Sequence, residues 1–461
     1  MLYRVGRRVL SRNPHLMVGV LGAVAKLVPQ GIRYGREFRK TRRFLQKSQW
    51  WSAEQHSEYQ LVKLKETIDY AYHHIPFYRE SFDAHGVSPN DLEELDDIRR
   101  FPKMNKDTLL ANYDRIHALE GDNLMPFCTG GTTGSGVWLN FEESFRQREQ
   151  AFIWHNWNRV GYKHGMLAAI LQHRECPPDI NDGIWYMDRV SNAMILSAQR
   201  LTHDSVERYL KVIETHGPKV LIAYPSLAYL FATYAKEIGW KKKVFDLVLC
   251  GSETLYDFQR RHLEEIFQAP VRIHYGHIES CALFGYCMES NIYHVQREYG
   301  LAEVLREDGA QAQPGESGEI VGTSFDNRSV PLVRFCTRDV AKVGHGTCNC
   351  GRNYPLIEKI EGREGDFIQT RSGKVHSPIV IEFLIDGRVG FSDLQIVQNN
   401  LDEVVVKVVR AANFTQAELD LFCTGLEERL EHEVRVTTEF ISEIPRTSQQ
   451  KKSLVVSNLS R

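Results

Sequence analysis

The segment 127–136 gathers glycines and threonines in a pattern that suits a phosphate-binding loop. The residues concerned are Thr129, Gly130, Gly131, Thr132, Thr133 and Gly134. Because glycine has no Cβ, successive backbone N–H groups can point into one concavity, and threonine hydroxyls can bond to anionic oxygens. The segment lacks the Gly-Lys-Ser/Thr ending of a Walker loop, which disfavours a kinase or P-loop ATPase. Taken alone, such a run is more often a surface turn, so its interpretation depends on the segments that follow.

Four charged segments follow this run in a fixed order. In chain order they are residues 275–279, 331–339, 362–366 and 445–451. They end in or contain Glu279, Asp339, Arg363 and Lys451. Together with the glycine run, this order resembles the adenylate-forming superfamily, and within it most of all phenylacetate–CoA ligase and the capsule-biosynthesis CapK-type proteins. The resemblance extends from about Ser48 to the C-terminus.

The resemblance implies a role for each segment in activating a carboxylate with ATP. That reaction drives an anionic oxygen onto the α-phosphorus, so the site must neutralise crowded negative charge. The loop 129–134 would hold the leaving phosphates, and Glu279 would help to bind Mg²⁺. Asp339 would accept hydrogen bonds from the ribose hydroxyls, and Arg363 would reinforce the ribose or the phosphate. Lys451 would bridge the attacking carboxylate and the phosphate.

Each of these residues also has a simpler interpretation. Glu279 could be an ordinary paired carboxylate, Asp339 could cap a turn at a strand end, and Lys451 could be a solvated lysine. The chain also departs from the family pattern at two glycines, because Arg338 precedes the aspartate and Gln450 precedes the lysine. These departures motivate an alternative in which the chain keeps the fold without the catalysis.

Alternating strands and helices are expected to position the central segments. The predicted strands cover residues 220–223, 245–249 and 271–275, and the predicted helices cover residues 227–238 and 255–267. This βαβ order is typical of a largely parallel sheet, in which ligands bind at the carboxyl ends of the strands. The cofactor-binding residues expected at those ends are Gly251, Ser252, Glu253, Tyr275 and Gly276. The residues expected around the acyl group are Tyr224, Ser226, Gly251, Ser252 and His277, with Trp154 and Trp157 near the approach.

The rest of the chain predicts further parts of an α/β protein. Apolar residues at three- and four-residue steps predict a helix over 54–80 that ends or kinks at Pro76. Turn-rich β structure follows Gly300, and a small α+β unit begins near Gly362. Its predicted elements are a strand over 403–409, a helix over 416–430 and a strand over 434–440.

We therefore expect a large N-terminal domain with mixed or parallel sheets, helices and a β-rich subdomain, followed by a small mobile α+β domain. The expected boundaries are a basic arm over 1–47, the large adenylate-forming domain over 48–361 and a C-terminal lid over 362–461. By resemblance, the lid pivots about Asp366 between two half-reactions, which withdraws Lys451 and admits the acceptor.

A separate group of soft ligands indicates a metal site. It consists of Cys287, His294, Cys348 and Cys350. Two pairs of such ligands suffice for tetrahedral zinc, although a CxC spacing alone is a weak signal and free cysteines often serve as small buried apolar residues. Several proteins similar to phenylacetate–CoA ligase carry a structural zinc with this order of ligands, which favours zinc here. His345 is a reserve ligand.

The composition limits the class of protein and its partners. The chain has 461 residues, of which 42% are hydrophobic and 25% charged, as in soluble globular proteins. A net charge of -2 gives no reason to expect nucleic acid as a partner. Nine cysteines, an odd number in a long chain, do not resemble a secreted disulfide framework and favour the reducing cytoplasm.

The first 47 residues differ from the rest in charge. They contain twelve lysines and arginines and one acid, Glu37. The apolar run from Leu16 to Val28, interrupted by Lys26, is too short to span a bilayer. The arm is therefore a solvated basic helix, a segment packed on the main domain, or a peripheral attachment to the anionic inner face of a membrane.

These observations lead to one functional prediction and one alternative. We expect an AMP-forming ligase that uses ATP to convert a small carboxylic acid into an acyl-adenylate. The acyl group then passes to a thiol such as coenzyme A, or to an amine. The CapK-type group is associated with cell-surface polysaccharide assembly, which suggests a pathway. The alternative is a non-catalytic nucleotide-binding or scaffold protein in a membrane-associated polysaccharide assembly.

Overall fold

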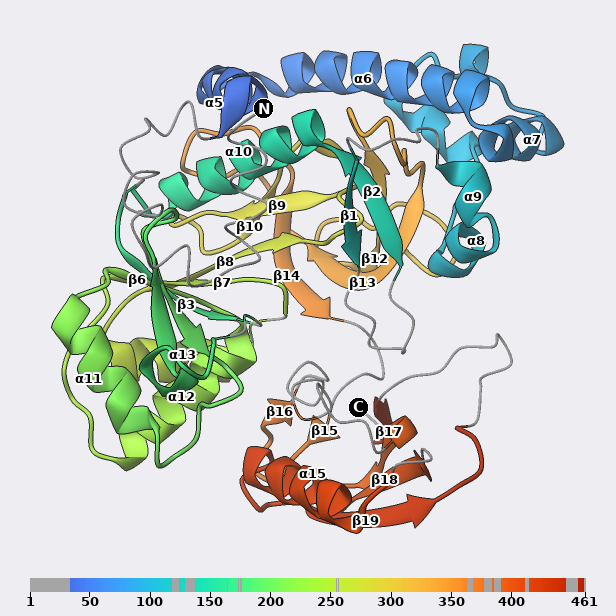
Figure 1. Ribbon diagram of the computed structural model, residues 1–461. Helices are drawn as coiled ribbons and strands as arrows, with labels where there is room; N and C mark the ends of the chain where they lie inside the picture. Colours follow the sequence, from blue (N-terminus) through green and yellow to red (C-terminus); the bar gives the residue numbers. More distant parts are fainter. Residues whose placement is uncertain are drawn as a thin grey trace.

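The computed structural model describes most of the chain (Figure 1). The described residues are 34–117, 124–128, 137–163, 165–172, 174, 176–253, 255, 257–362, 368–376, 384, 391–410, 414–444 and 455–459. Several residues named above therefore lie outside the described residues. They are the loop 129–134, Arg363, Asp366, Gln450, Lys451 and the arm residues 1–33.

A twelve-stranded sheet organises the larger part of the molecule, in the order β11-β12-β13-β14-β10-β9-β8-β7-β6-β3-β5-β4. One half of it is parallel from β5 through β3, β6 and β7 to β8, with β4 added antiparallel at the edge. The strands of this half are β3 (Ala168–Gln172), β4 (Trp185–Asp188), β5 (Ala193–Ser197), β6 (Val220–Ala223), β7 (Leu247–Cys250) and β8 (Val271–Gly276). Strands β6 and β7 are buried along their whole length, as continuous apolar runs in a covered parallel sheet should be.

Helices α11 (Val206–His216), α12 (Pro225–Glu237) and α13 (Asp257–Phe267) pack beside these strands, and the short turn η3 (Asn181–Gly183) precedes β4 (Figure 1). The predicted strand and helix order is confirmed here, and the strand expected over 220–223 has the predicted bounds. The strand expected over 245–249 begins at Leu247 instead, because Asp246 donates its N–H to the carbonyl of Lys219 before the ladder starts.

The other half of the sheet is antiparallel. Strand β8 is paired parallel with β7 on one side and antiparallel with β9 on the other, so it joins the two halves. The strands of this half are β9 (Leu283–Tyr286), β10 (Tyr293–Val295), β11 (Gly300–Leu305), β12 (Ser317–Ser324), β13 (Phe335–Val343) and β14 (Leu356–Gly362). A separate antiparallel pair, β1 (Leu124–Cys128) and β2 (Trp138–Glu142), leads into the long helix α10 (Glu143–Arg159). The expected mixed α/β class is confirmed.

The N-terminal helices lie along one side of the sheet (Figure 1). They are α5 (Gly35–Ser48), α6 (Ala53–His74), α7 (Pro76–Ala84), η1 (Pro89–Asp91), η2 (Leu95–Arg100), α8 (Lys106–Ala111) and α9 (Tyr113–Ile116). The Ser52 hydroxyl accepts a hydrogen bond from Gln55 N, and the Gln55 side chain accepts one from Ser52 N, which forms a capping box at the start of α6. Ile75 ends α6 and Pro76 begins α7, so the expected break at this proline is confirmed.

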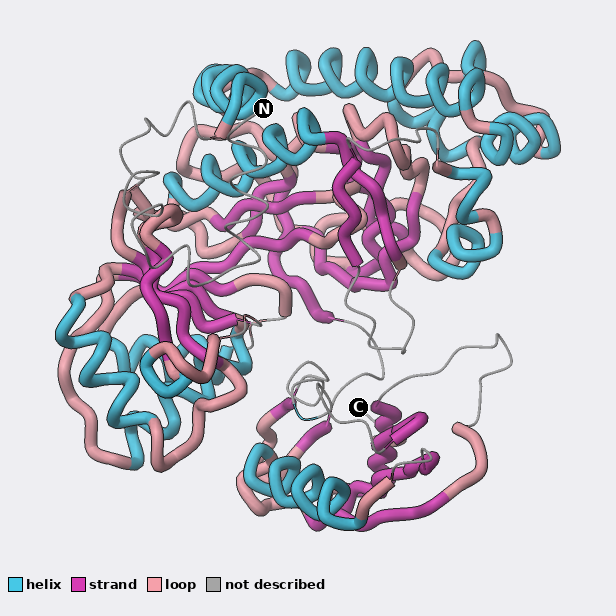
Figure 2. The backbone as a smooth tube through the Cα atoms, viewed as in Figure 1, coloured by secondary structure: helices cyan, strands magenta, loops and turns pink. Residues whose placement is uncertain are grey.

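The C-terminal residues form a second, four-stranded sheet in the order β19-β18-β17-β20, with helix α15 packed on it (Figure 2). Its strands are β17 (Phe391–Asn400), β18 (Glu403–Arg410), β19 (Arg435–Phe440) and β20 (Val455–Ser457), and the helix is α15 (Gln416–Arg429). A separate antiparallel pair, β15 (Ile368–Gln369) and β16 (Val375–His376), precedes them in the chain. The predicted strand, helix and strand are confirmed within one residue at each boundary. Lys374 Nζ, between β15 and β16, lies 5.9 Å from the ring centroid of Tyr229 on α12, so the β15–β16 pair contacts the larger part of the molecule. None of the helices in the described ranges combines the length and apolarity needed to cross a membrane.

Candidate active site

The end of β8 is hydrogen-bonded to β13, and the bond joins two of the predicted segments. The Tyr275 hydroxyl donates to Asp339 Oδ2 at 2.9 Å, although the two residues are 64 positions apart. Burial, followed by the negative charge of Asp339, raises the pKa of Tyr275 well above its usual value, so this hydroxyl stays protonated and donates. The residue expected to bind the ribose is thereby placed beside the segment expected to bind the metal.

The turn after β8 brings His277 and Glu279 into contact. His277 Nδ1 lies 3.2 Å from Glu279 Oε2, and the two side chains are only 9% and 12% exposed. His277 Nε2 lies 3.6 Å from Cys281 Sγ. Burial by itself lowers the pKa of His277, but the Cys281 sulfur and the Glu279 carboxylate together raise it well above its usual value. The carboxylate expected to bind Mg²⁺ is therefore paired with His277, and the pairing favours the protonated form of this imidazole.

A buried carboxylate on α10 anchors this turn, and the sequence analysis did not identify it. Glu149 Oε1 accepts hydrogen bonds from the Ser280 hydroxyl at 3.0 Å and the Tyr299 hydroxyl at 3.3 Å. Glu149 also forms an ion pair with Arg146. Glu149 lies four positions after Phe145 and three before Phe152, which are both buried on α10. This helical spacing puts Glu149 on the buried face and could have identified it from the sequence.

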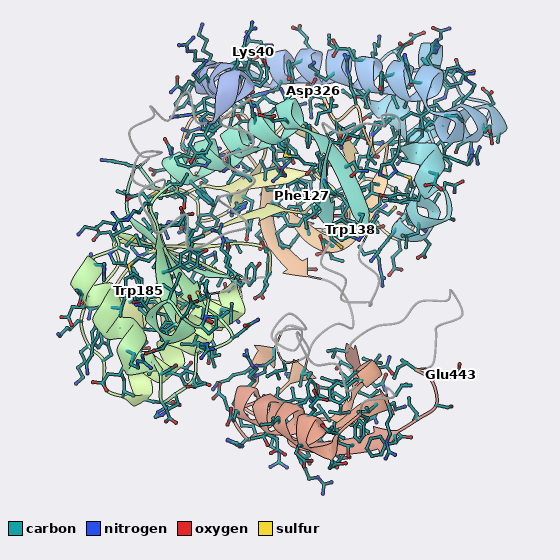
Figure 3. The ribbon with its side chains drawn as sticks, in the orientation of Figure 1. Lys40, Phe127, Trp138, Trp185, Asp326 and Glu443 are labelled. Atoms are coloured by element: carbon teal, nitrogen blue, oxygen red, sulfur yellow. The ribbon has the colours of Figure 1, made fainter. Side chains whose placement is uncertain are left out.

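Arg146 connects the anchor to the strand that precedes the glycine run. Its guanidinium lies 4.0 Å above the ring centroid of Phe127, which projects from the β1–β2 pair (Figure 3). Phe127 is the penultimate residue of β1, and the glycine run begins directly after that strand. One carboxylate thus links the turn that carries Glu279 to the base of the predicted phosphate loop.

The carboxyl end of β7 approaches β8 too closely for any side chain on residue 251. A Cβ added to Gly251 would lie 2.9 Å from His274 Cε1, so the buried His274 ring would have to move to admit a side chain here. The next residue, Ser252, is exposed and has a φ of 70°, in the left-handed region. Burial lowers the pKa of His274 to about 4, and its neutral ring accepts a hydrogen bond from Trp157 Nε1 at 3.4 Å.

The remaining predicted pocket residues have different positions. Tyr224 directly precedes α12 at the carboxyl end of β6 and is half-buried, as is Glu253 in the turn after β7. The side chain of Ser226 lies outside the described part of the structure. Trp154 is buried against Tyr34 and Phe38, which agrees with a packing role rather than a contact with substrate.

The four predicted metal ligands come together at the far ends of the antiparallel strands. The ligand atoms of Cys287, His294, Cys348 and Cys350 all lie within 4.8 Å of one another. Cys287 Sγ lies 3.4 Å from Cys348 Sγ, and Cys350 Sγ lies 3.9 Å from His294 Nε2. The reserve ligand His345 is not part of this group and lies beside Gly315.

The charges around this cluster are compatible with a bound divalent metal. Three thiolates and a neutral imidazole around Zn²⁺ would carry a net charge of about -1. Two arginines lie next to the cluster, Arg159 with Nη2 2.7 Å from His294 Nδ1 and Arg352 beside Cys350. A metal at Nε2 leaves the imidazole proton on Nδ1, so filling the site requires Arg159 to turn away from that nitrogen.

The chain is similar in sequence to known proteins over most of its length. Residues 367–458 match the family model described as CapK C-terminal domain. Protein CapK of Staphylococcus aureus is 23% identical over 414 residues, covering 87% of this chain and 89% of that protein. Phenylacetate-coenzyme A ligase of Escherichia coli K12 is 24% identical over 406 residues, covering 82% of this chain and 89% of that protein.

Solved structures share the fold. The crystal structure of 2-hydroxyisobutyryl-CoA ligase with 2-HIB-AMP and CoA in the thioesterification state has a TM-score of 0.59 and 19% identity, covering 89% of this chain and 91% of that one. The same ligase in the postadenylation state with R3-HIB-AMP has a TM-score of 0.58 and 18% identity, covering 89% and 93%. The sequence relatives and the fold together confirm the resemblance noted from the motifs. Over most of its length the chain is similar to proteins named CapK and phenylacetate-coenzyme A ligase, and residues 367–458 match the CapK C-terminal domain.

Proposed function

We propose that this protein is an ATP-dependent, AMP-forming ligase that activates a small carboxylic acid as an acyl-adenylate. The observation that carries the proposal is the hydrogen bond between Tyr275 and Asp339. It brings Asp339, which would accept the ribose hydroxyls, next to the turn that holds Glu279, at the carboxyl edge where a parallel sheet binds ligands. The relatives named phenylacetate-coenzyme A ligase support the same reaction class.

The described residues would act on the nucleotide from two sides. Asp339 would release or share the Tyr275 hydroxyl and accept the ribose hydroxyls, since a carboxylate has about four acceptor sites. Glu279 would hold Mg²⁺, a hard cation that prefers oxygen ligands and would supply charge neutralisation to the phosphates when bound. The imidazolium of His277, 3.2 Å from Glu279, would add positive charge beside the developing pyrophosphate. The roles of loop 129–134, Arg363 and Lys451 rest on the resemblance alone.

The acceptor we propose is the thiol of coenzyme A. The phenylacetate–CoA ligases among the relatives transfer to this thiol by name, and a solved structure of the same fold holds CoA with an acyl-adenylate. An amine remains the second candidate for the acceptor. The relationship to CapK makes cell-surface polysaccharide assembly the proposed setting, with the enzyme in the cytoplasm.

We also propose that the four-residue cluster holds a structural zinc ion. The proposal rests on four soft ligands within 4.8 Å of one another and on the two neighbouring arginines. Four protein ligands leave no position open for water, so such a site would stabilise strands rather than take part in the reaction.

The first test is carboxylate-dependent ATP–pyrophosphate exchange with pooled aromatic, fatty, amino and sugar acids. We expect exchange with one pool, and we expect Lys451→Ala to lower it about 100-fold or more, because the cation is needed only as charge develops. The adjacent Lys452→Ala is the matched control and should change exchange less than about twofold.

The result also separates the alternatives. Release of ADP instead of AMP would contradict the proposal and indicate a kinase. Binding of ATP without exchange in any pool would contradict it as well, and would favour a non-catalytic nucleotide-binding protein in a membrane-associated polysaccharide assembly. In that case no acyl-adenylate forms, and transfer to an amine or a thiol need not be assayed.

A further inference from the structure

Helix α5 has one face buried against α10 and one face covered with basic residues. The buried residues are Phe38, Thr41, Leu45 and Ser48, and the Phe38 ring packs edge-on against Trp154 of α10. The opposite, exposed face carries Arg36, Arg39, Lys40, Arg43 and Lys47. Glu37 is the one acid in this helix, and it lies 3.9 Å from Lys40. We call the five exposed basic residues, together with Trp50, the basic face.

Trp50 adds an exposed aromatic ring at the end of this helix. It is 55% exposed, the only tryptophan besides Trp138 with a large exposed fraction among the described residues. The guanidinium of Arg352 lies 4.4 Å above the ring centroid, so a further cation is held at the same end. An amphipathic ring beside cations is the arrangement that favours the boundary between water and lipid.

The excess of basic residues is local to the N-terminal part of the sequence and includes the residues before α5. The whole chain has a net charge of -2, yet residues 1–33 contain six lysines and arginines and no acid. They lead directly into α5, and they include the apolar run over 16–25. Figure 1 shows α5 and α6 on the side of the molecule away from α15 and β17–β19. A surface bound through α5 would therefore leave the C-terminal sheet clear.

We infer that the basic face of α5 docks on an anionic lipid bilayer. Lipid headgroups supply a plane of negative charge for the five cations, and the interface accepts the Trp50 ring. The inference does not depend on the proposed ligase activity, because none of these residues belongs to the candidate active site. Attachment through α5 would concentrate the protein at a membrane face.

Co-sedimentation of the full chain with vesicles of phosphatidylglycerol in phosphatidylcholine tests the inference. We expect binding to these vesicles, little binding to pure phosphatidylcholine, and release as salt shortens the screening length. The triple change Arg39→Gln, Lys40→Gln and Arg43→Gln should weaken binding at least about tenfold, since each basic residue near such a surface contributes roughly fivefold. Trp50→Gln should weaken it by a smaller factor.

The matched control is Lys241→Gln, Lys242→Gln and Lys243→Gln, which removes the same charge from an exposed run between α12 and β7. It should change vesicle binding less than about twofold. An equal loss of vesicle binding in the two triple variants would show that only the net charge matters and would overturn the inference. The absence of binding to anionic vesicles would also overturn it. Tighter binding to duplex DNA than to vesicles, lost in the α5 variant, would overturn it in favour of nucleic acid. Far-ultraviolet circular dichroism and ATP–pyrophosphate exchange should be unchanged in both variants.

Discussion

The two halves of the large sheet contribute different things to the candidate site. The parallel half, β3 and β5 to β8, contributes features of the backbone at its carboxyl edge. They are Gly251, where an added Cβ would contact the His274 ring, and the turn after Gly276. The antiparallel half, β9 to β14, contributes Asp339 and the four clustered metal-ligand residues. The difference teaches that the closest backbone approach lies in the parallel half and Asp339 in the antiparallel half, whereas His277 and Glu279 lie in the turn after β8, the strand that joins the two halves.

The largest expected effect lies in the antiparallel half. If its metal cluster is structural, Cys348→Ser should remove zinc and lower the free energy of unfolding by more than about 3 kcal/mol, because metal binding contributes to folding. Zinc content and urea unfolding measure the two effects together. Cys423→Ser makes the same chemical change on α15, outside the cluster, and should cost about 1 kcal/mol or less. Equal losses of stability in the two variants would contradict a structural metal.

The next largest effect distinguishes Asp339 from Tyr275, the two residues whose hydrogen bond joins the halves of the sheet. Asp339→Asn removes the charge that would accept the ribose hydroxyls, and should raise the KM for ATP about 10- to 100-fold, since hydrogen bonds to charged groups contribute about 1.5–3 kcal/mol. Tyr275→Phe removes only the hydroxyl and should change this KM less than about fivefold. Steady-state ATP–pyrophosphate exchange measures both. A Tyr275→Phe variant as impaired as Asp339→Asn would assign the role to the tyrosine instead.

A smaller effect is expected at the anchor between the halves. Glu149→Gln keeps an acceptor for Ser280 and Tyr299 but leaves Arg146 without its counter-charge, so the free energy of unfolding should fall by about 1–3 kcal/mol. The double variant Glu149→Gln with Arg146→Met should recover part of this loss. A double-mutant cycle by urea unfolding gives the coupling energy. Simple additivity would show that the ion pair does not act as a unit.

The smallest effect is expected at two residues with positive φ angles, one in each half of the sheet. Arg338 in β13 and Ser252 after β7 have φ angles of 64° and 70°, which glycine adopts without strain. Arg338→Gly and Ser252→Gly should each change the free energy of unfolding by about 1 kcal/mol or less, because relief of strain is offset by the freedom of glycine in the unfolded chain. Arg338→Ala, which keeps the strain and loses the side chain, is the control. Thermal unfolding distinguishes them, and stabilisation by the alanine variant would contradict the backbone explanation.

Three strands of the parallel half, β6 to β8, could be predicted from sequence because their signals are local. Short apolar runs such as Val220–Ala223 alternate with helices of regular apolar spacing, whereas β3, β4, β5 and the order of the strands in the sheet were not predicted. The C-terminal elements β18 and α15 were predictable for the same reason. The short strands β9 and β10 were not predicted, because three or four residues acquire strand geometry only from partners distant in the sequence.

The site was predictable in its parts and less so in its contacts. The motifs named Tyr275 and Asp339, but their hydrogen bond depends on the antiparallel pairing that no local pattern specifies. The pairing of His277 with Glu279 follows from a tight turn whose geometry the sequence did not reveal. Glu149 was missed because a single glutamate in a helix normally faces water. The cluster of four metal-ligand residues was expected from the resemblance, and its occupancy by zinc stays a prediction.

The position of β8 has a consequence for how the molecule loses its structure. It is hydrogen-bonded to β7 in one direction and to β9 in the other, so the ladder runs unbroken from one edge of the sheet to the other. Opening either half exposes β8, and neither half can unfold by itself without breaking bonds to this strand. The two halves should therefore melt as one cooperative unit. The amide hydrogens of Ile273 and its neighbours should be among the last to exchange with solvent.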